Sequence, residues 1–371
     1  MARIAFRADA SLTIGTGHVM RCLTLAETVR EAGHAVRFVT RAQPGHLAAR
    51  IGAAGFDTVL LPAPDGSFAP DADDPAHAAW AGVAWTEDAR ATAAAIESFR
   101  PDWLVVDHYA FDERWERVLA GHVGRILAWD DLADRPHACD LLLDQNLGRG
   151  PWDYAALVPE GARVLTGPRY AVLRPEFAAL RPDALARRTD GALRRIMVSM
   201  GGVDEPNATG AVLDVLAGVP GLDHVQVDVI LGSRAPAIAA VRAQAAAMPM
   251  PVEVSVDVDD MARRMVRADL AIGAVGGTTW ERCALGLPSL LLTIAKNQRP
   301  AAAALHDSGA AYLLGDLSDA EWGGRLTGWL SDRGRDDQLL RMATAAAGIC
   351  DGEGGDRIAR ALFTGTEGAS A

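Results

Sequence analysis

Short apolar runs alternate with longer amphipathic stretches along the first 150 residues. A strand is predicted at residues 3–9, which precede residues 17–32, where Val19, Leu23 and Ala26 recur at helical spacing. The same criteria predict strands at residues 35–40, 58–61, 103–107, 125–129 and 141–144, and helices at 87–99 and 113–120. Strands separated by helices indicate right-handed βαβ units and a parallel sheet. Residues 62–75, rich in Pro, Asp, Gly and Ala, are predicted to be an exposed loop.

The alternation restarts in the second half of the chain. Strands are predicted at residues 195–200, 225–231, 252–256, 270–273 and 289–294, and helices at 207–217, 260–267 and 279–285. The charged, proline-containing residues 174–188 are interpreted as the connection between the halves. We therefore predict two Rossmann-like, doubly wound α/β domains that face each other across a cleft. Their expected bounds are residues 1–178 and 179–350, followed by a tail at 351–371.

Length and charge agree with this picture and exclude some partners. A chain of 371 residues is typical of two domains. The formal charge of −12 argues against nucleic acid or an anionic membrane as the main partner. The longest apolar run, 284–295, contains Pro288 and is too short to span a bilayer. No signal peptide is recognised after Arg7, so we expect a cytoplasmic protein, as a monomer or weak dimer.

The four cysteines are scattered and contain no C-x-x-C pair. This spacing argues against a zinc site or a disulfide framework, so buried free thiols are predicted for Cys22, Cys139, Cys283 and Cys350.

Ligands of open α/β sheets bind beyond the carboxyl ends of the strands, so the residues that follow each strand are the candidates. After the first predicted strand, a loop with Gly15 enters a helix at about Gly17, which puts His18 on the first helical turn. Glycines there allow a ligand to approach the backbone, and an imidazole can act as a base near neutral pH. The alternative is that His18 is only a surface residue of the first helical turn.

Two further strands of the first half end in polar residues. One is followed by Asp107-His108-Tyr109 and another by Asp130-Asp131. Consecutive functional side chains are typical of a lined cleft, whereas isolated aspartates are equally common as helix caps or turn residues. Both interpretations stay open for Asp130 and Asp131.

In the second half, two glycine-rich turns each join a strand to a helix. They are Gly201-Gly202-Val203-Asp204, followed by Asn207, and Gly276-Gly277-Thr278-Thr279, followed by Glu281. Backbone N–H groups at such turns favour a diphosphate. Thr278-x-x-Glu281 also matches a helix capping box, so Glu281 is interpreted either as a capping residue or as a ligand of a ribose diol.

The exit of the last predicted strand carries Lys296, the chain's only lysine, followed by Asn297 and Gln298. Amides at this position can hold a sugar hydroxyl or an N-acetyl group, whereas an Asn-rich loop exit is the structural alternative. Lys296 is interpreted as incidental rather than catalytic.

Seven motifs, in order, resemble those of the UDP-sugar hydrolases of the pseudaminic acid pathway. They are Arg7-Ala-Asp9-Ala-Ser11 with Gly15-Thr-Gly17-His18 and Arg21-Cys22; Asp107-His108-Tyr109; Asp130-Asp131; Gly167-Pro168 to Phe177; Gly201-Gly202-Val-Asp204 with Asn207; Gly276-Gly277 to Pro288; and Asn297-Gln298. The resemblance runs from about residue 3 to residue 315. Residues 62–86 and the tail after Gly352 lie outside it.

The resemblance implies a GT-B-type fold, similar to that of the N-acetylglucosaminyltransferase that completes the peptidoglycan lipid intermediate. It also implies hydrolysis of UDP-2,4-diacetamido-2,4,6-trideoxy-β-L-altropyranose to UDP and free sugar, with inversion and with neither metal nor cofactor. UDP leaves as a stabilised anion, so one base and a phosphate-binding site can suffice, without the paired carboxylates of ordinary glycosidases.

The residue roles follow from this resemblance. The predicted catalytic residues are His18, Asp107, Tyr109 and Asn297, with His18 as the base. The predicted substrate-binding residues are Gly15, Gly17, Arg21, His108, Gly201, Gly202, Asp204, Asn207, Gly276, Gly277, Thr278, Thr279, Glu281 and Gln298. Two other functions remain possible: a glycosyltransferase that uses the same UDP site, and a nucleotide-sugar-binding module without turnover. A base in a glycine loop argues against the second.

Overall fold

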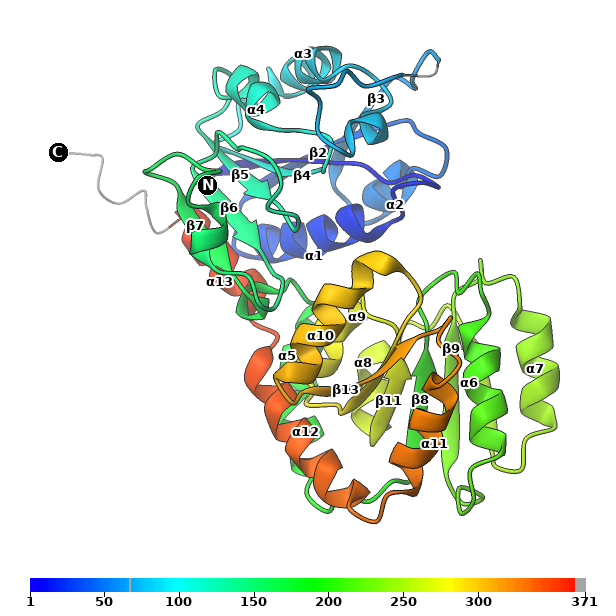
Figure 1. Ribbon diagram of the computed structural model, residues 1–371. Coiled ribbons are helices and arrows are strands. Elements are labelled where there is room, and N and C mark those ends of the chain that lie inside the picture. The colour runs from blue at the N-terminus through cyan, green and yellow to red at the C-terminus, as the bar shows by residue number, and fades with distance from the viewer. Residues whose placement is uncertain (67, 364–371) are drawn as a thin grey trace. The chain divides into compact units, whose positions relative to one another are not determined.

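The computed structural model describes residues 1–66 and 68–363. The chain divides into two compact units, each built on its own parallel sheet (Figure 1). Unit 1 comprises Met1–Val172 together with the described residues from Gly354 onward, and unit 2 comprises Leu173–Glu353.

Unit 1 contains a seven-stranded sheet in the order β3-β2-β1-β4-β5-β6-β7. The strands are β1 (Arg3–Ala8), β2 (Ala35–Arg41), β3 (Asp57–Leu61), β4 (Trp103–Asp107), β5 (Arg125–Trp129), β6 (Leu141–Asp144) and β7 (Arg163–Thr166). The helices are α1 (Gly17–Glu31), α2 (Ala48–Ala53), α3 (Trp85–Ile96), α4 (Glu113–Leu119) and α13 (Gly354–Phe363).

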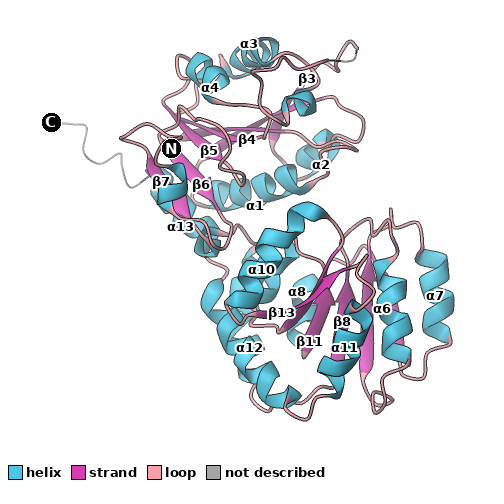
Figure 2. Cartoon of the chain, viewed as in Figure 1, coloured by secondary structure: helices cyan, strands magenta, loops and turns pink. Residues whose placement is uncertain are grey.

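Each face of this sheet carries its own apolar core, because successive side chains of a strand point to opposite faces. In β1, Ile4 and Phe6 are fully buried and share a core with α1 and α13. Ala5 lies between them and belongs to the core formed with α3 and α4. Helices therefore cover both faces, which is the doubly wound arrangement (Figure 2).

Unit 2 contains a six-stranded sheet in the order β10-β9-β8-β11-β12-β13. The strands are β8 (Arg195–Ser199), β9 (Gln226–Leu231), β10 (Val252–Val256), β11 (Leu270–Gly273), β12 (Ser289–Thr293) and β13 (Ala311–Asp316). The helices are α5 (Pro175–Arg187), α6 (Ala208–Ala217), α7 (Ile238–Ala246), α8 (Met261–Arg267), α9 (Thr278–Ala284), α10 (Arg299–Asp307), α11 (Trp322–Ser331) and α12 (Arg335–Ile349).

The strands and helices predicted from the hydrophobic pattern are present, with ends shifted by at most three residues. The described part of the predicted loop at 62–75 contains no helix or strand. The pattern missed β7 and β13, whose burial is mixed, and α2, α7, α10, α11 and α12. The four cysteines are buried free thiols, as predicted. Among the described residues, no helix is both long and apolar enough to cross a membrane.

The predicted connection at residues 174–188 is instead helix α5, so the structure places the boundary between Val172 and Leu173. Arg181 holds α5 within unit 2, because its guanidinium donates to the carbonyls of Ala284, Ala347 and Cys350 at 2.5–2.9 Å. These long-range bonds leave no signal in the hydrophobic pattern.

The predicted tail is also different in its described part. Residues Gly354–Phe363 form α13, which packs on α1 of unit 1. Ile358 and Leu362, four residues apart, are fully buried in the core that α1 shares with β1. The chain returns to unit 1 because this apolar stripe covers a sheet face that α1 alone leaves open.

Candidate active site

Each sheet has one point at which the strand order reverses, between β1 and β4 in unit 1 and between β8 and β11 in unit 2. Ligands of open α/β folds bind at the carboxyl ends of the strands at such a point. His18 follows β1, and Asp107 ends β4, whose neighbour in the sheet is β1. The glycine-rich turns of the second half follow β8 and β11. The sequence motifs therefore lie at the two reversal points.

His18 and Asp107 form the centre of the site in unit 1. Helix α1 begins at Gly17, which puts His18 in its first turn. The imidazole Nδ1 lies 2.6 Å from Asp107 Oδ1. The His18 residue is 8% exposed to solvent, whereas Asp107 is fully buried. The structure thus joins two of the three residues of this half, His18, Asp107 and Tyr109, that the sequence predicted to be catalytic.

Arg21, one turn after His18, holds the same carboxylate from the other side. Its Nε and Nη2 donate to the two oxygens of Asp107 at 2.6 Å, and its Nη1 donates to Asp131 Oδ2 at 2.6 Å. Burial alone would raise the pKa of Asp107, but the charge of Arg21 and the hydrogen bonds from Arg21 and His18 hold that pKa well below its usual range. Asp107 is therefore a carboxylate at any physiological pH.

An ionised Asp107 decides which nitrogen of His18 carries the proton. A carboxylate only accepts hydrogen bonds, so Nδ1 donates to it and the neutral ring keeps its lone pair on Nε2. Nε2 makes no hydrogen bond to any residue that the structure describes. The pair has the geometry of the His–Asp half of a catalytic triad, in which the aspartate orients the base.

Beneath this pair lies a fully buried ion network. Arg7 donates to both oxygens of Asp9 at 2.6 and 2.9 Å and to Asp88 at 2.7 Å. Arg41 adds a second bond to Asp88 at 2.7 Å, and its backbone N–H donates to Asp9 at 2.7 Å. These residues are at most 1% exposed. The network fixes the loop after β1, and thereby the start of α1, by charge-assisted bonds.

His108 belongs to this network rather than to the His18 face. Its Nδ1 accepts the backbone N–H of Ala110 at 3.1 Å, and its buried Nε2 lies 3.3 Å from Asp9 Oδ2, outside hydrogen-bond geometry. Burial lowers the pKa of His108, so the ring is neutral. These contacts give it a structural task, and its predicted part in substrate binding remains a prediction.

The two neighbouring aspartates after β5 have different tasks. Asp130 accepts a hydrogen bond from the N–H of Ala133 at 2.8 Å and forms an ion pair with Arg135 at 2.7 Å. These contacts stabilise the turn after β5. Asp131 faces the site, since it accepts Arg21 and the hydroxyl of Tyr109, the latter at 2.5 Å. Asp131 is a site residue that the sequence left undecided.

Tyr109 lies against the base. Its ring meets the His18 ring edge to face at 4.6 Å and 84°. Burial, together with Asp131, raises the pKa of the phenol well above its usual value, so the hydroxyl stays protonated and donates to Asp131. This contact positions the ring, and a direct catalytic part for Tyr109 stays a prediction.

The loop before α1 is open at both of its glycines. Gly15 has a backbone φ of +81°, which residues with a side chain rarely adopt. Its N–H donates a hydrogen bond to the carbonyl of Ser11 at 2.9 Å and so closes a turn. A Cβ placed at Gly15 or Gly17 would meet no atom within 4 Å. Neighbouring atoms therefore do not block access to the backbone at these two positions.

The glycine turns of unit 2 are open in the same way. Gly201, Gly202, Gly276 and Gly277 are exposed, and a Cβ at any of them would meet no atom within 4 Å. Of the four, only Gly201 has a positive φ. Internal packing thus does not require glycine at the other three, and glycine is the residue that a close approach of a ligand to the backbone would favour.

The polar residues after the first turn cap helix α6. Asp204 is 4% exposed, and its two oxygens accept the N–H groups of Ala208 and Thr209 at 2.8 and 3.0 Å. Asn207 is the N-cap and accepts Gly210 N–H at 3.2 Å. Both side chains have structural bonds, and their binding of substrate stays a prediction.

Glu281 does not form the capping box that its spacing allows. Helix α9 is capped by Gly277 without a side-chain bond, and no described residue hydrogen-bonds the Glu281 carboxyl group. Burial raises the pKa of Glu281 to about 7, while Arg174 and Arg282 oppose this rise. Glu281 has no hydrogen-bond partner among the described residues, so its interpretation as a ligand of a ribose diol is favoured over its interpretation as a helix cap.

The adjacent Arg282 is a cation that the sequence analysis missed. It is 4% exposed, and no described carboxylate forms an ion pair with it. Its Nη2 donates to Ala274 O at 2.8 Å and to Thr279 Oγ1 at 3.2 Å, and Thr279 Oγ1 also accepts Gly276 N–H at 3.1 Å. Burial lowers the pKa of Arg282 to about 10, so it stays charged at neutral pH. A buried charge behind an open glycine turn attracts anions.

Residues Lys296–Gln298 form a short 3-10 turn after β12. The side chain of Gln298 accepts Ile294 N–H at 2.9 Å and so braces the turn. Lys296 and Asn297 are exposed. Asn297 belongs to unit 2 and His18 to unit 1, so their joint action is a prediction.

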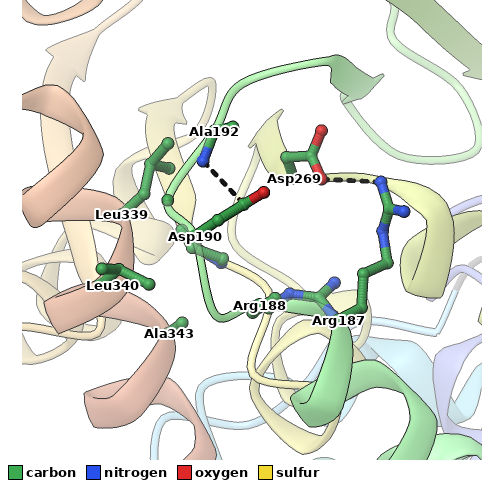
Figure 3. A pocket seen from close by; sticks show the side chains of 10 residues that line it. Arg187, Arg188, Asp190, Ala192, Asp269, Leu339, Leu340 and Ala343 are labelled. Carbon is green, nitrogen blue, oxygen red and sulfur yellow. Dashed lines mark hydrogen bonds and ion pairs between the residues drawn. The ribbon is translucent and has the colours of Figure 1, made fainter.

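A small, partly open pocket of unit 2 lies away from these motifs. It is lined by Arg187, Arg188, Asp190, Gly191, Ala192, Asp269, Pro288, Leu339, Leu340 and Ala343 (Figure 3). Ala192, Asp269 and Pro288 precede strands β8, β11 and β12, so it lies at the amino ends of the strands. Its volume of about 20 Å³ holds about one water. It is therefore not a nucleotide-sugar site.

No family model matches the chain. Two curated proteins are similar to parts of it. A UDP-2,4-diacetamido-2,4,6-trideoxy-β-L-altropyranose hydrolase from Campylobacter jejuni is 28% identical over 173 residues, 46% of this chain and 52% of the hydrolase. The spore coat polysaccharide biosynthesis protein SpsG from Bacillus subtilis is 32% identical over 158 residues, 43% of this chain and 45% of SpsG. The matches thus span about half the length of each relative, and the first one agrees with the resemblance found in the motifs.

Solved structures match over nearly the whole chain. MurG from Acinetobacter baumannii has a TM-score of 0.70 at 15% identity, over 98% of this chain and 100% of MurG. The glycosyltransferase SsfS6 from Streptomyces sp. SF2575, in complex with thymidine diphosphate, has a TM-score of 0.58 at 14% identity, over 96% and 99%. With its two parallel-sheet α/β units, the chain has the GT-B fold that was predicted.

Proposed function

We propose that this protein hydrolyses a UDP-linked diacetamido-trideoxy-hexose to UDP and the free sugar. The observation that carries the proposal is the 2.6 Å contact of His18 Nδ1 with Asp107, which leaves Nε2 as an available base at the reversal point of unit 1. Binding alone would require neither a fixed tautomer nor a carboxylate held ionised. We therefore propose catalysis rather than binding alone, with water as the nucleophile.

The reaction needs one base. His18 Nε2 takes a proton from water as the water oxygen bonds to the anomeric carbon, and Asp107 stabilises the imidazolium that forms. The bond between the anomeric carbon and the diphosphate oxygen breaks, and its electron pair leaves with UDP. The proton on His18 then passes to solvent. Attack opposite the leaving group inverts the anomeric configuration.

Unit 2 supplies the groups expected to bind UDP. The open backbone at Gly201, Gly202, Gly276 and Gly277 suits a diphosphate, and Arg282 adds a positive charge behind the second turn. Glu281, without a hydrogen-bond partner among the described residues, suits the ribose diol. A UDP anion is stabilised as it leaves, so the proposal includes no metal.

The curated hydrolase supports the choice of substrate, and the spore coat relative supports a task in polysaccharide biosynthesis. The fold is shared with glycosyltransferases, so transfer of the sugar to an acceptor is the second candidate. It differs from hydrolysis only in the nucleophile that reaches the anomeric carbon.

Release of UDP by the purified protein separates these candidates. The assay uses the altrose-configured UDP-sugar without any acceptor, with and without EDTA, beside a panel of other UDP-sugars. Hydrolysis predicts UDP and free sugar in both conditions, with the altrose-configured substrate preferred. UDP release that requires an acceptor would establish a transferase, and loss of activity in EDTA would contradict the metal-free mechanism.

A further inference from the structure

The segment at residues 62–86 lies outside the family motifs, yet it is tied firmly to unit 1. The side-chain amide of Gln43, which is 8% exposed, donates to the carbonyl of Trp80 at 2.7 Å. Arg114 pairs with Asp74 at 3.0 Å, and Arg41 donates to Pro62 O at 3.0 Å. These bonds come from β2 and α4 and from the residues that follow β2. They hold the end of the segment at a defined place.

That place is beside the base. The Trp80 ring centroid lies 6.2 Å from that of His18 at 75°, and it stacks on Tyr109 at 5.7 Å and 28°. His77 lies 4.6 Å from Trp80 and 5.8 Å from Tyr109. His77, Trp80 and Tyr109 are each partly exposed. We call these three side chains the aromatic wall.

The aromatic wall is the apolar part of an otherwise charged site. The other groups around His18 are Asp107, Arg21 and Asp131. A partly exposed tryptophan leaves apolar area in water, and a ligand that covers this area gains roughly 25 cal/mol per Å². Pockets for small molecules combine apolar and aromatic walls with a few polar groups that fix orientation. The wall therefore fits an apolar edge of the sugar that reacts at His18.

We propose that Trp80, as part of the aromatic wall, binds the C6 methyl edge of the hexose and selects 6-deoxy sugars over their 6-hydroxy counterparts. This inference rests on the proposed function. The acetamido groups of such a sugar carry N–H and C=O groups that need polar partners, whereas the C6 methyl needs none. A C6 hydroxyl against the indole face would lose hydrogen bonds to water without replacement.

The test compares kcat and KM for the 6-deoxy UDP-sugar and for the same compound with a hydroxymethyl group at C6. Wild type is expected to prefer the 6-deoxy substrate by about 100-fold in kcat/KM. Trp80→Ala should reduce that preference to a few-fold, mainly by raising KM for the 6-deoxy substrate. Trp80→Phe, which keeps an aromatic ring, should retain most of it. The control is Trp152→Ala, because Trp152 is 75% exposed and lies in the same unit.

A binding experiment keeps this inference separate from the proposed function. The intact 6-deoxy UDP-sugar is added to the His18→Asn variant, and saturation-transfer NMR reports which ligand protons touch the protein. We expect strong transfer to the C6 methyl that is lost in the His18→Asn, Trp80→Ala double variant, with UDP binding unchanged. An unaltered C6 preference in a folded Trp80→Ala enzyme overturns the inference and leaves hydrolysis standing. A wild type that binds the sugar through its methyl group without hydrolysing it overturns the proposed function instead.

Discussion

The imidazole of His18 and the carboxylate of Asp107 are joined by a 2.6 Å contact between Nδ1 and Oδ1, and Arg21 holds the opposite side of the same carboxylate. His18 comes from the helix that follows β1, and Asp107 comes from the end of β4, 89 residues later. The parallel pairing of β1 with β4 brings them together. The contact makes the tautomer of His18, rather than its mere presence, the property on which the proposed activity depends.

The first prediction concerns that tautomer. In Asp107→Asn, the amide nitrogen can donate to Nδ1, which would move the ring proton to Nε2 and remove the base. We expect kcat to fall by about 10³- to 10⁴-fold while UDP affinity changes less than threefold. Steady-state kinetics and UDP titration measure both quantities. Asp134→Asn, at a side chain that is 41% exposed, is the matched control and should stay near wild type. A fully active, folded Asp107→Asn protein would contradict the role of the pair.

The second prediction concerns the ribose. At pH 8, above the Glu281 pKa of about 7, Glu281→Gln replaces a charged acceptor with a neutral one, so UDP should bind about tenfold more weakly, whereas 2′-deoxy-UDP should lose less than threefold. Calorimetric titration of both nucleotides measures the difference. The control variant is Glu253→Gln, whose side chain is 66% exposed. Equal losses for the two nucleotides would show that Glu281 does not bind the 2′-hydroxyl.

The third prediction concerns pH and stability. His137 Nδ1 lies 2.8 Å from Glu116 Oε1, and both side chains are buried. Burial alone would lower the pKa of His137, but Glu116 and Asp130 raise it to about 9. The folded state then binds a proton that the unfolded state, with a pKa of about 6.5, releases.

This pair should therefore contribute stability that is complete below about pH 6.5 and lost as the pH rises to about 9. The size is on the order of 3 kcal/mol. Urea unfolding of wild type and His137→Gln between pH 6 and 9.5 measures it, with exposed His122→Gln as control. The stability gap between the two proteins should narrow by about this amount as the pH rises, and a gap independent of pH would exclude the ion pair as its cause.

The fourth prediction concerns the C-terminal helix. Ile358 in α13 is fully buried against the α1 core, so Ile358→Ala should lower the free energy of unfolding by about 2–5 kcal/mol. Val118→Ala, at a side chain that is 43% exposed, should change it by about 0.5 kcal/mol or less. Thermal and urea unfolding compare them. Equal effects would mean that α13 contributes little to unit 1.

Local pattern was enough for most of the central strands and for the residues that follow them. Strands β1, β4 and β5 are short and largely apolar, and the polar residues after them are found at the carboxyl ends of the strands, where they were expected. The GT-B fold followed from the motifs. Helix α5 and the return of α13 to unit 1 were missed, because both depend on contacts between residues far apart in the chain.

Only part of the site was predicted, because some of its residues are also brought together by contacts between distant parts of the chain. His18 and Asp107 stand in recognisable contexts, whereas the sequence left Asp131 undecided between a cleft residue and a turn residue, and only its contacts with Arg21 and Tyr109 place it beside His18. Trp80 and Arg282 carried no signal, since an aromatic residue in a loop and an arginine in a helix are ordinary in sequence. Their proximity to His18 and to the glycine turn is a property of the fold alone.

The most direct test of the central claim is a proton NMR time course of the altrose-configured UDP-sugar with purified protein, without acceptor, beside the His18→Asn variant. The mechanism predicts that wild type releases UDP and that the first free sugar to appear has the inverted anomeric configuration, before mutarotation. His18→Asn should bind the substrate but turn it over at least 10²-fold more slowly. Absence of UDP release from wild type without an acceptor, or unchanged turnover by His18→Asn, would contradict hydrolysis by a water that His18 activates.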